Sequence, residues 1–115
     1  MAMNEDASAW RPVCSIGDVE IGTPRRVEPE GLPPLAVFQL EDGYFVTDDT
    51  CTHGEASLCD GFVEGDEIEC PFHSGKFCVK DGRATAFPAV DPIRAYPTRV
   101  IDHTVWIAVG DTGAT

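Results

Sequence analysis

Positive charge is scarce in this sequence of 115 residues. Lysine and arginine total 8 against 20 aspartates and glutamates, and the formal net charge at pH 7 is −12. A protein that binds nucleic acid neutralises phosphates with lysine and arginine, so this balance argues against a nucleic-acid partner. The acidity is explained either by solvation alone or by electrostatic steering towards a basic protein surface.

Long hydrophobic runs are also missing. No stretch approaches the roughly 20 apolar residues of a transmembrane helix, and residues 1–6 lack the basic and apolar regions of a signal peptide. No long segment has the 3.6-residue period of an amphipathic helix. We therefore expect a cytoplasmic protein without membrane association, and an all-β fold.

Short apolar segments separated by turn residues predict antiparallel strands. The turns are Glu41-Asp42-Gly43, Gly65-Asp66 and Asp102-His103. At this length the chain forms one domain, which we place at residues 10–110 after a flexible tail of residues 1–9. The expected strands are residues 10–14, a short one at Val27, then 35–40, 44–47, 62–64, 67–69, 76–79, 98–101 and 104–109.

Two short motifs hold the candidate functional residues. The first contains Cys51 and His53, the second Cys70 and His73, and sixteen residues separate His53 from Cys70. Two thiols and two imidazoles form a donor set for a transition metal. In an extended chain, Cα atoms at i and i+2 are about 6–7 Å apart. That separation is wide for one ion and suits two metal atoms of a single cluster.

These motifs resemble the Rieske ferredoxin family, whose pattern is Cys-x-His, about sixteen residues, then Cys-x-x-His. The resemblance implies a [2Fe–2S] cluster with Cys51 and Cys70 on one iron and His53 and His73 on the other. It also implies an antiparallel β-sandwich or barrel. A cluster-binding subdomain, here an excursion of about residues 48–80, would lie at one tip.

The resemblance further implies a function. The chain would be a one-electron carrier and not an enzyme, because no second catalytic apparatus is visible in the sequence. It would pass electrons from an NAD(P)H-dependent reductase to the terminal oxygenase of an aromatic-ring-hydroxylating dioxygenase system. Both partners would bind transiently, and we expect a monomer.

Two alternatives remain open at this point. The first is the small Rieske subunit of an assimilatory nitrite reductase, although members of that group often lack the cluster ligands. The second is a structural zinc module with a Cys₂His₂ site. Such sites usually take their ligands from Cys-x₂₋₄-Cys and His-x₃₋₅-His pairs, which this chain lacks.

The chain departs from the respiratory branch of the family at four positions. That branch has two further cysteines, which form a disulfide between the loops, where this chain has Ala56 and Phe72. It also has a serine and a tyrosine that donate hydrogen bonds to sulfur where this chain has Gly75 and Phe77. Fewer hydrogen bonds to sulfur disfavour the reduced cluster. We therefore predict a potential near the bottom of the Rieske range, about −150 mV.

Three cysteines and one histidine are left over. In a reducing compartment we expect Cys14, Cys59 and Cys78 to be small buried side chains without a redox role. His103 lies in a predicted two-residue turn that the motif does not include, so we expect it to be exposed to solvent.

Overall fold

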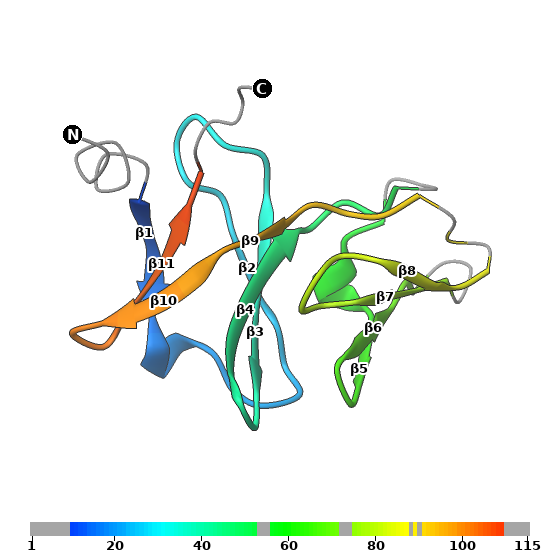
Figure 1. Cartoon of the computed structure of the whole chain (residues 1–115), viewed down its shortest axis with the longest axis horizontal. Coiled ribbons are helices and arrows are strands. Elements are labelled where there is room, and N and C mark those ends of the chain that lie inside the picture. Colours follow the sequence, from blue (N-terminus) through cyan, green and yellow to red (C-terminus); the bar gives the residue numbers. More distant parts are fainter. Residues whose placement is uncertain (1–9, 53–55, 72–74, 88, 90, 110–115) are drawn as a thin grey trace.

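The computed structural model describes residues 10–52, 56–71, 75–87, 89 and 91–109. These residues form three antiparallel sheets that follow one another along the longest axis of the molecule (Figure 1). The first sheet has the order β1 (Trp10–Ser15), β11 (Thr104–Ala108), β10 (Thr98–Ile101). The second has the order β2 (Arg25–Val27), β3 (Leu35–Leu40), β4 (Gly43–Asp48), β9 (Ala95–Tyr96). The third has the order β5 (Phe62–Glu64), β6 (Glu67–Glu69), β7 (Lys76–Cys78), β8 (Ala84–Ala86).

The all-β prediction is confirmed. Within the described ranges the helical elements are two single-turn 3₁₀ helices, η1 (Ile16–Asp18) and η2 (Leu58–Asp60). No helix in this part of the chain is long and apolar enough to cross a membrane. The predicted strands agree with the observed ones to within about two residues at their ends. Strands β8 and β9 were not predicted, because they are short and the second lies among prolines.

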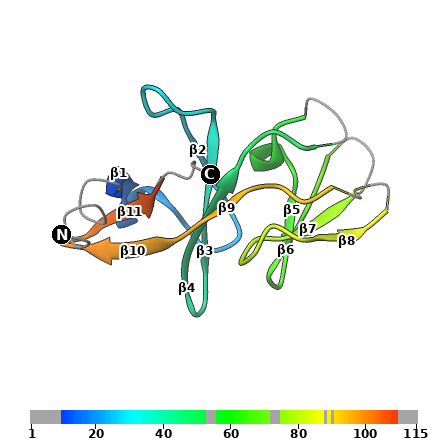
Figure 2. The same ribbon diagram turned by 45° about the horizontal axis from the view of Figure 1, so that its top comes forward.

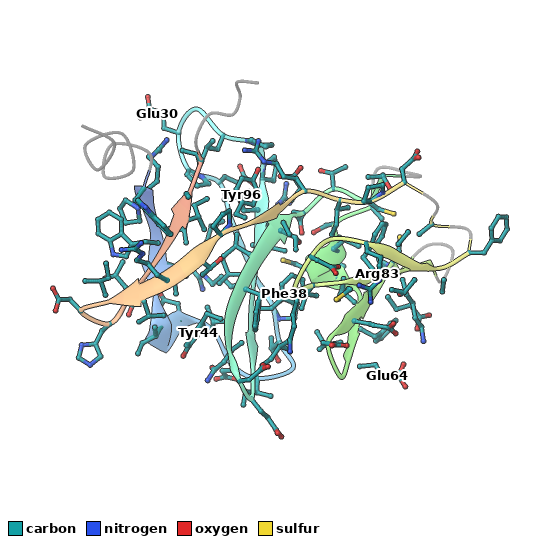
Figure 3. All side chains as sticks on the ribbon, in the orientation of Figure 1. Glu30, Phe38, Tyr44, Glu64, Arg83 and Tyr96 are labelled. Carbon is teal, nitrogen blue, oxygen red and sulfur yellow. The ribbon has the colours of Figure 1, made fainter. Side chains whose placement is uncertain are left out.

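Strand β3 separates two hydrophobic cores. Successive side chains of a strand point to opposite faces, and both faces of β3 are covered, so its six residues are nearly all buried. One face, which includes Phe38, packs in a core with the third sheet (Figure 3). The other face, which includes Val37, packs in a core with β11. The continuous apolar run at 35–40 is therefore the signature of a strand that is buried on both sides.

The two ends of the domain meet in the first sheet. Strand β1 pairs with β11, and the turn of Asp102 and His103 connects β10 to β11. Both turn residues have positive φ, +52° and +65°, as a two-residue hairpin of this hand requires. The side chain of His103 is exposed, which confirms its predicted place in a solvated turn.

The third sheet lies at the opposite end of the molecule from the first sheet, and both views show this separation (Figures 1 and 2). It extends to Ala86, beyond the predicted excursion of residues 48–80. The boundaries proposed from the sequence, including the domain at 10–110, stay predictions. Residues 1–9, the predicted tail, lie outside the described residues.

Candidate metal centre

Both predicted ligand loops are closed by the same backbone frame. In the first loop, Thr50 and Ser57 form an antiparallel bridge. The Cys51 N–H group donates to the Ala56 carbonyl at 3.0 Å. The loop therefore begins at a cysteine and ends five residues later, directly above a β-bridge.

The second loop repeats this frame. Glu69 pairs with Lys76 in the β6–β7 ladder, and the Cys70 N–H group donates to the Gly75 carbonyl at 2.7 Å. In each loop the residue before the cysteine pairs with the residue six positions after the cysteine. The two cysteines are therefore structurally equivalent, although the histidine lies at i+2 in the first motif and i+3 in the second.

Both cysteines are buried in the same core. Cys51 and Cys70 are each 1% exposed and belong to the cluster that contains Phe38, Leu58 and Phe77. The structure thus brings together the two sulfur ligands predicted from the sequence, at the starts of two matching loops. His53 and His73 lie outside the described residues, and among the described residues no group of three or more His, Cys, Asp or Glu side chains could hold a metal ion.

The donor chemistry of this site fits an iron–sulfur cluster. Thiolate sulfur is the ligand of iron in such clusters, and a buried, apolar shell limits solvent access, which tunes the potential. The two thiols come from separate loops and lie in one core, as a pair of candidate sulfur donors. These residues fit one iron of a [2Fe–2S] group.

A buried carboxylate supports the first loop and was not predicted from the sequence. Asp49 is 1% exposed, and its side chain accepts hydrogen bonds from the Ser57 hydroxyl at 2.6 Å and from the Cys59 N–H group at 3.0 Å. The Arg26 guanidinium lies 3.5 Å from the same carboxylate. A buried charge needs such partners. Nothing in the pattern Asp48-Asp49 distinguishes this residue from a surface acid.

Two further contacts tie the loops to the rest of the fold. The Thr52 hydroxyl donates to the Asp91 carbonyl at 2.8 Å, which links the first loop to the segment before β9. Gly61, directly after η2, lies so close to the end of β6 that a Cβ atom there would overlap the Glu69 carbonyl oxygen. The chain after the first loop therefore packs against the residue that precedes Cys70.

The remaining cysteines are less uniform than predicted. Cys78 is buried as expected, whereas Cys14 and Cys59 are only partly buried. Burial raises the pKa of the Cys59 thiol, and the neighbouring Asp49 carboxylate raises this pKa further. Burial also raises the pKa of Cys14. Both thiols are therefore held in their protonated, unreactive form near neutral pH.

Three of the four departures lie in the described residues, and one of them, Gly75, closes the second loop. Ala56 is buried at the closing position of the first loop, and the Phe77 side chain is fully buried in the core beside the second loop. Neither carries a polar group. Phe72, the other half of the absent disulfide, lies outside the described residues.

Comparison with known proteins agrees with this geometry. Residues 9–97 match the Rieske [2Fe-2S] domain. Ferredoxin CarAc of Metapseudomonas resinovorans is 43% identical over 99 residues, which are 86% of this chain and 92% of that protein. The structure of the Sphingomonas yanoikuyae B1 ferredoxin has a TM-score of 0.83 at 44% identity, covering 85% of this chain and 96% of that one.

A third match was solved as a complex. It is a complex of reduced oxygenase and oxidized ferredoxin in carbazole 1,9a-dioxygenase. The matched chain has a TM-score of 0.82 at 41% identity, and the match covers 90% of this chain and 96% of that chain.

The all-β fold, the two buried cysteines in matching loops and the domain match together define a small iron–sulfur protein of the electron-transfer class. The matched domain covers most of the described residues and both loops. The chain belongs to the Rieske [2Fe-2S] family. Its cofactor is a Rieske-type [2Fe–2S] cluster, and it is a ferredoxin, an electron-transfer component that is not itself the oxygenase. The match favours the carrier over both alternatives, the nitrite reductase subunit and the zinc module.

Proposed function

We propose that this ferredoxin carries single electrons from an NAD(P)H-dependent reductase to the terminal oxygenase of an aromatic-ring-hydroxylating dioxygenase system. The observation that carries the proposal is the near-complete match to ferredoxins of such systems, at 43% identity to ferredoxin CarAc. The match covers 92% of that protein, so the two chains correspond over nearly their whole length. Oxygen activation and binding of the aromatic substrate belong to the oxygenase.

We further propose Cys51, His53, Cys70 and His73 as the four ligands of the cluster. Two observations support this set: the equivalent, buried positions of Cys51 and Cys70, and the family's spacing of cysteine and histidine. When bound, the cluster accepts and releases one electron without a bond being made or broken in the protein. The loops hold the thiols in place, and the core keeps water from them.

The same proposal includes the electron source, the location and the oligomeric state of the protein. The reductase is the source of electrons, the chain acts in the cytoplasm, and it acts as a monomer. A carrier that visits two partners in turn gains from weak, fast contacts, and its net charge of −12 favours fast association with basic surfaces.

EPR spectroscopy of the purified protein before and after dithionite tests the cofactor and its ligands. We expect a silent oxidised sample that gains a rhombic signal with mean g below the free-electron value. Pulsed EPR of the reduced sample should detect two coordinated imidazole nitrogens. His53→Ala and His73→Ala should each remove one nitrogen coupling or lose the cluster.

His103→Ala is the matched control, because His103 is exposed and distant in sequence from both motifs. This variant should keep the signal and both nitrogen couplings. Retention of two nitrogen couplings in His53→Ala or His73→Ala would contradict the ligand assignment.

The place of the protein in a redox chain is tested by reconstitution. We expect the cluster-loaded protein to support product formation by an aromatic-ring-hydroxylating oxygenase when NADH and a ferredoxin reductase are supplied. The carbazole 1,9a-dioxygenase components provide a first test system. No electron transfer to the oxygenase, from a protein whose cluster is intact by EPR, would contradict the proposed function.

A further inference from the structure

Two exposed aromatic side chains stand apart from the rest of the described surface. Of its five exposed large hydrophobic residues, the two aromatic ones are Phe62, 64% exposed, and Phe87, 83% exposed. A phenylalanine that is mostly exposed contributes little to folding, and exposed apolar groups rimmed by polar residues are typical of interaction sites.

The strand register places both phenylalanines beside the second ligand loop. Phe62 pairs with Glu69, the last residue before Cys70. Phe87 directly follows Ala86, which pairs with Lys76, the first residue after the loop closes at Gly75. β5 and β8 are the two edge strands of this sheet, and the loop connects the two central strands. With strands about 4.8 Å apart, the phenylalanines flank the loop across about 14 Å.

The adjoining sheet face is acidic. By strand alternation, Glu64, Glu67 and Glu69 lie on the face opposite the buried Ile68 and Phe77. Glu64, which points away from the body of the protein (Figure 3), and Glu67 are direct cross-strand partners. Like charges placed directly opposite each other are destabilising. The one cation in this ladder, Lys76, is bound to Glu64 at 3.1 Å.

We propose that Phe62 and Phe87 are the apolar anchors of a docking surface, with the Glu64–Glu67–Glu69 face as its acidic rim, and that its partner is a basic face of the terminal oxygenase. Aromatic anchors surrounded by a charged rim are the usual anatomy of a protein interface. A surface next to the loop of Cys70 brings a partner close to the cluster, as electron transfer requires. This inference rests on the proposed function.

The oxygenase is favoured as occupant for two reasons. A ferredoxin that is 41% identical to this chain forms a complex with its oxygenase. The three glutamates of this face outnumber its one lysine, Lys76, so the face keeps negative charge after the Lys76–Glu64 ion pair, which favours a basic docking face. Use of this surface to bind the reductase, or a second copy of this chain, would contradict the proposal.

The test is calorimetric titration of the cluster-loaded full chain against the terminal oxygenase of carbazole 1,9a-dioxygenase. We expect Phe62→Ala and Phe87→Ala each to raise Kd about tenfold, by the same factor at low and high salt. Glu67→Gln should instead weaken the salt dependence of binding. Ile101→Ala is the matched control, because Ile101 is also exposed, at 44%, on β10 in the first sheet.

Each outcome has a defined meaning. Redox potential and EPR signal should be unchanged in all four variants, which shows that the cluster is intact. Wild-type Kd values for both phenylalanine variants would overturn the docking surface. The proposal would also be overturned if the phenylalanine variants bound the oxygenase normally but were reduced more slowly by the reductase. The same holds if the wild-type chain formed a dimer that these variants did not form. Failure of the wild-type chain to bind the oxygenase would instead count against the partner class in the proposed function.

Discussion

The two ligand loops have the same backbone frame and different support. In both, the cysteine N–H group bonds the carbonyl five residues later, above a pair of bridged residues. The second loop extends the regular β6–β7 hairpin, so backbone hydrogen bonds of the ladder hold its base. The first loop stands on one isolated bridge, and two side chains add support: the buried Asp49 carboxylate and the Thr52 hydroxyl, which donates to the Asp91 carbonyl.

In the first loop, side-chain hydrogen bonds give support that the backbone ladder of β6 and β7 gives to the second loop. Asp49 accepts hydrogen bonds from a hydroxyl and a backbone N–H group, both partly buried, that would otherwise lack these partners. The consequence is an uneven sensitivity to mutation, since a ladder of backbone bonds survives most side-chain changes. We therefore expect the first loop to be more sensitive to side-chain substitution, above all at Asp49, than the second loop.

Asp49→Ala should have the largest effect. It leaves the Ser57 hydroxyl and the Cys59 N–H group without their partner, whereas Arg26 keeps its ion pair with Glu28. We expect a loss of about 3 kcal/mol in the free energy of unfolding. Hydrogen exchange followed by mass spectrometry should show faster exchange in peptides from the first loop. Equal acceleration in the β6–β7 hairpin would contradict the separate support of the two loops.

Gly61→Ala should follow, because it affects the contact between the two loops. The added methyl group would overlap the Glu69 carbonyl, and overpacking of this kind costs about 2 kcal/mol. Denaturant unfolding measures the loss. Gly17→Ala is the control, since the nearest atom to its new Cβ is the Ser15 hydroxyl at 3.9 Å, and its stability should change by less than about 0.5 kcal/mol.

Cys59→Ala should flatten the loss of stability at alkaline pH. The raised pKa of the Cys59 thiol means that the folded state keeps a proton which the unfolded state loses above its ordinary pKa of about 8.5. Stability is therefore fully present below that pH and falls above it, by at most about 1.4 kcal/mol per pH unit. Denaturant unfolding from pH 8 to 10 measures the slope. An unchanged slope in the variant would contradict the raised pKa of the Cys59 thiol in the folded state.

Phe77→Tyr addresses the second loop and should have the smallest effect. In the respiratory branch a tyrosine at this position donates to ligand sulfur. A hydrogen bond worth about 1 kcal/mol to the reduced cluster would raise the potential by about 40 mV above the wild-type value. Redox titration of both proteins decides the matter. A wild-type potential above zero would contradict the argument from missing hydroxyl groups.

Local pattern predicted much of this fold. The hairpins of residues 35–48 and 62–69 were predictable because alternation and turn residues act within a few positions of each other. The cofactor was predictable because two cysteines and two histidines in that spacing have few other uses. Strands β8 and β9 were missed, because three and two residues are too short for a period to be recognised.

The sequence by itself determined the longer strands, the donor set and the family, since each depends on residue types at fixed short spacings. Only the tertiary structure decided which strands pair and that β3 divides two cores. It also decided that Asp49 is buried, whereas Asp48 is half-buried and Thr50 is exposed. It also decided that Phe62 and Phe87, twenty-five positions apart, flank one loop. Burial and proximity arise from packing between distant segments, and no local pattern of residues specifies them.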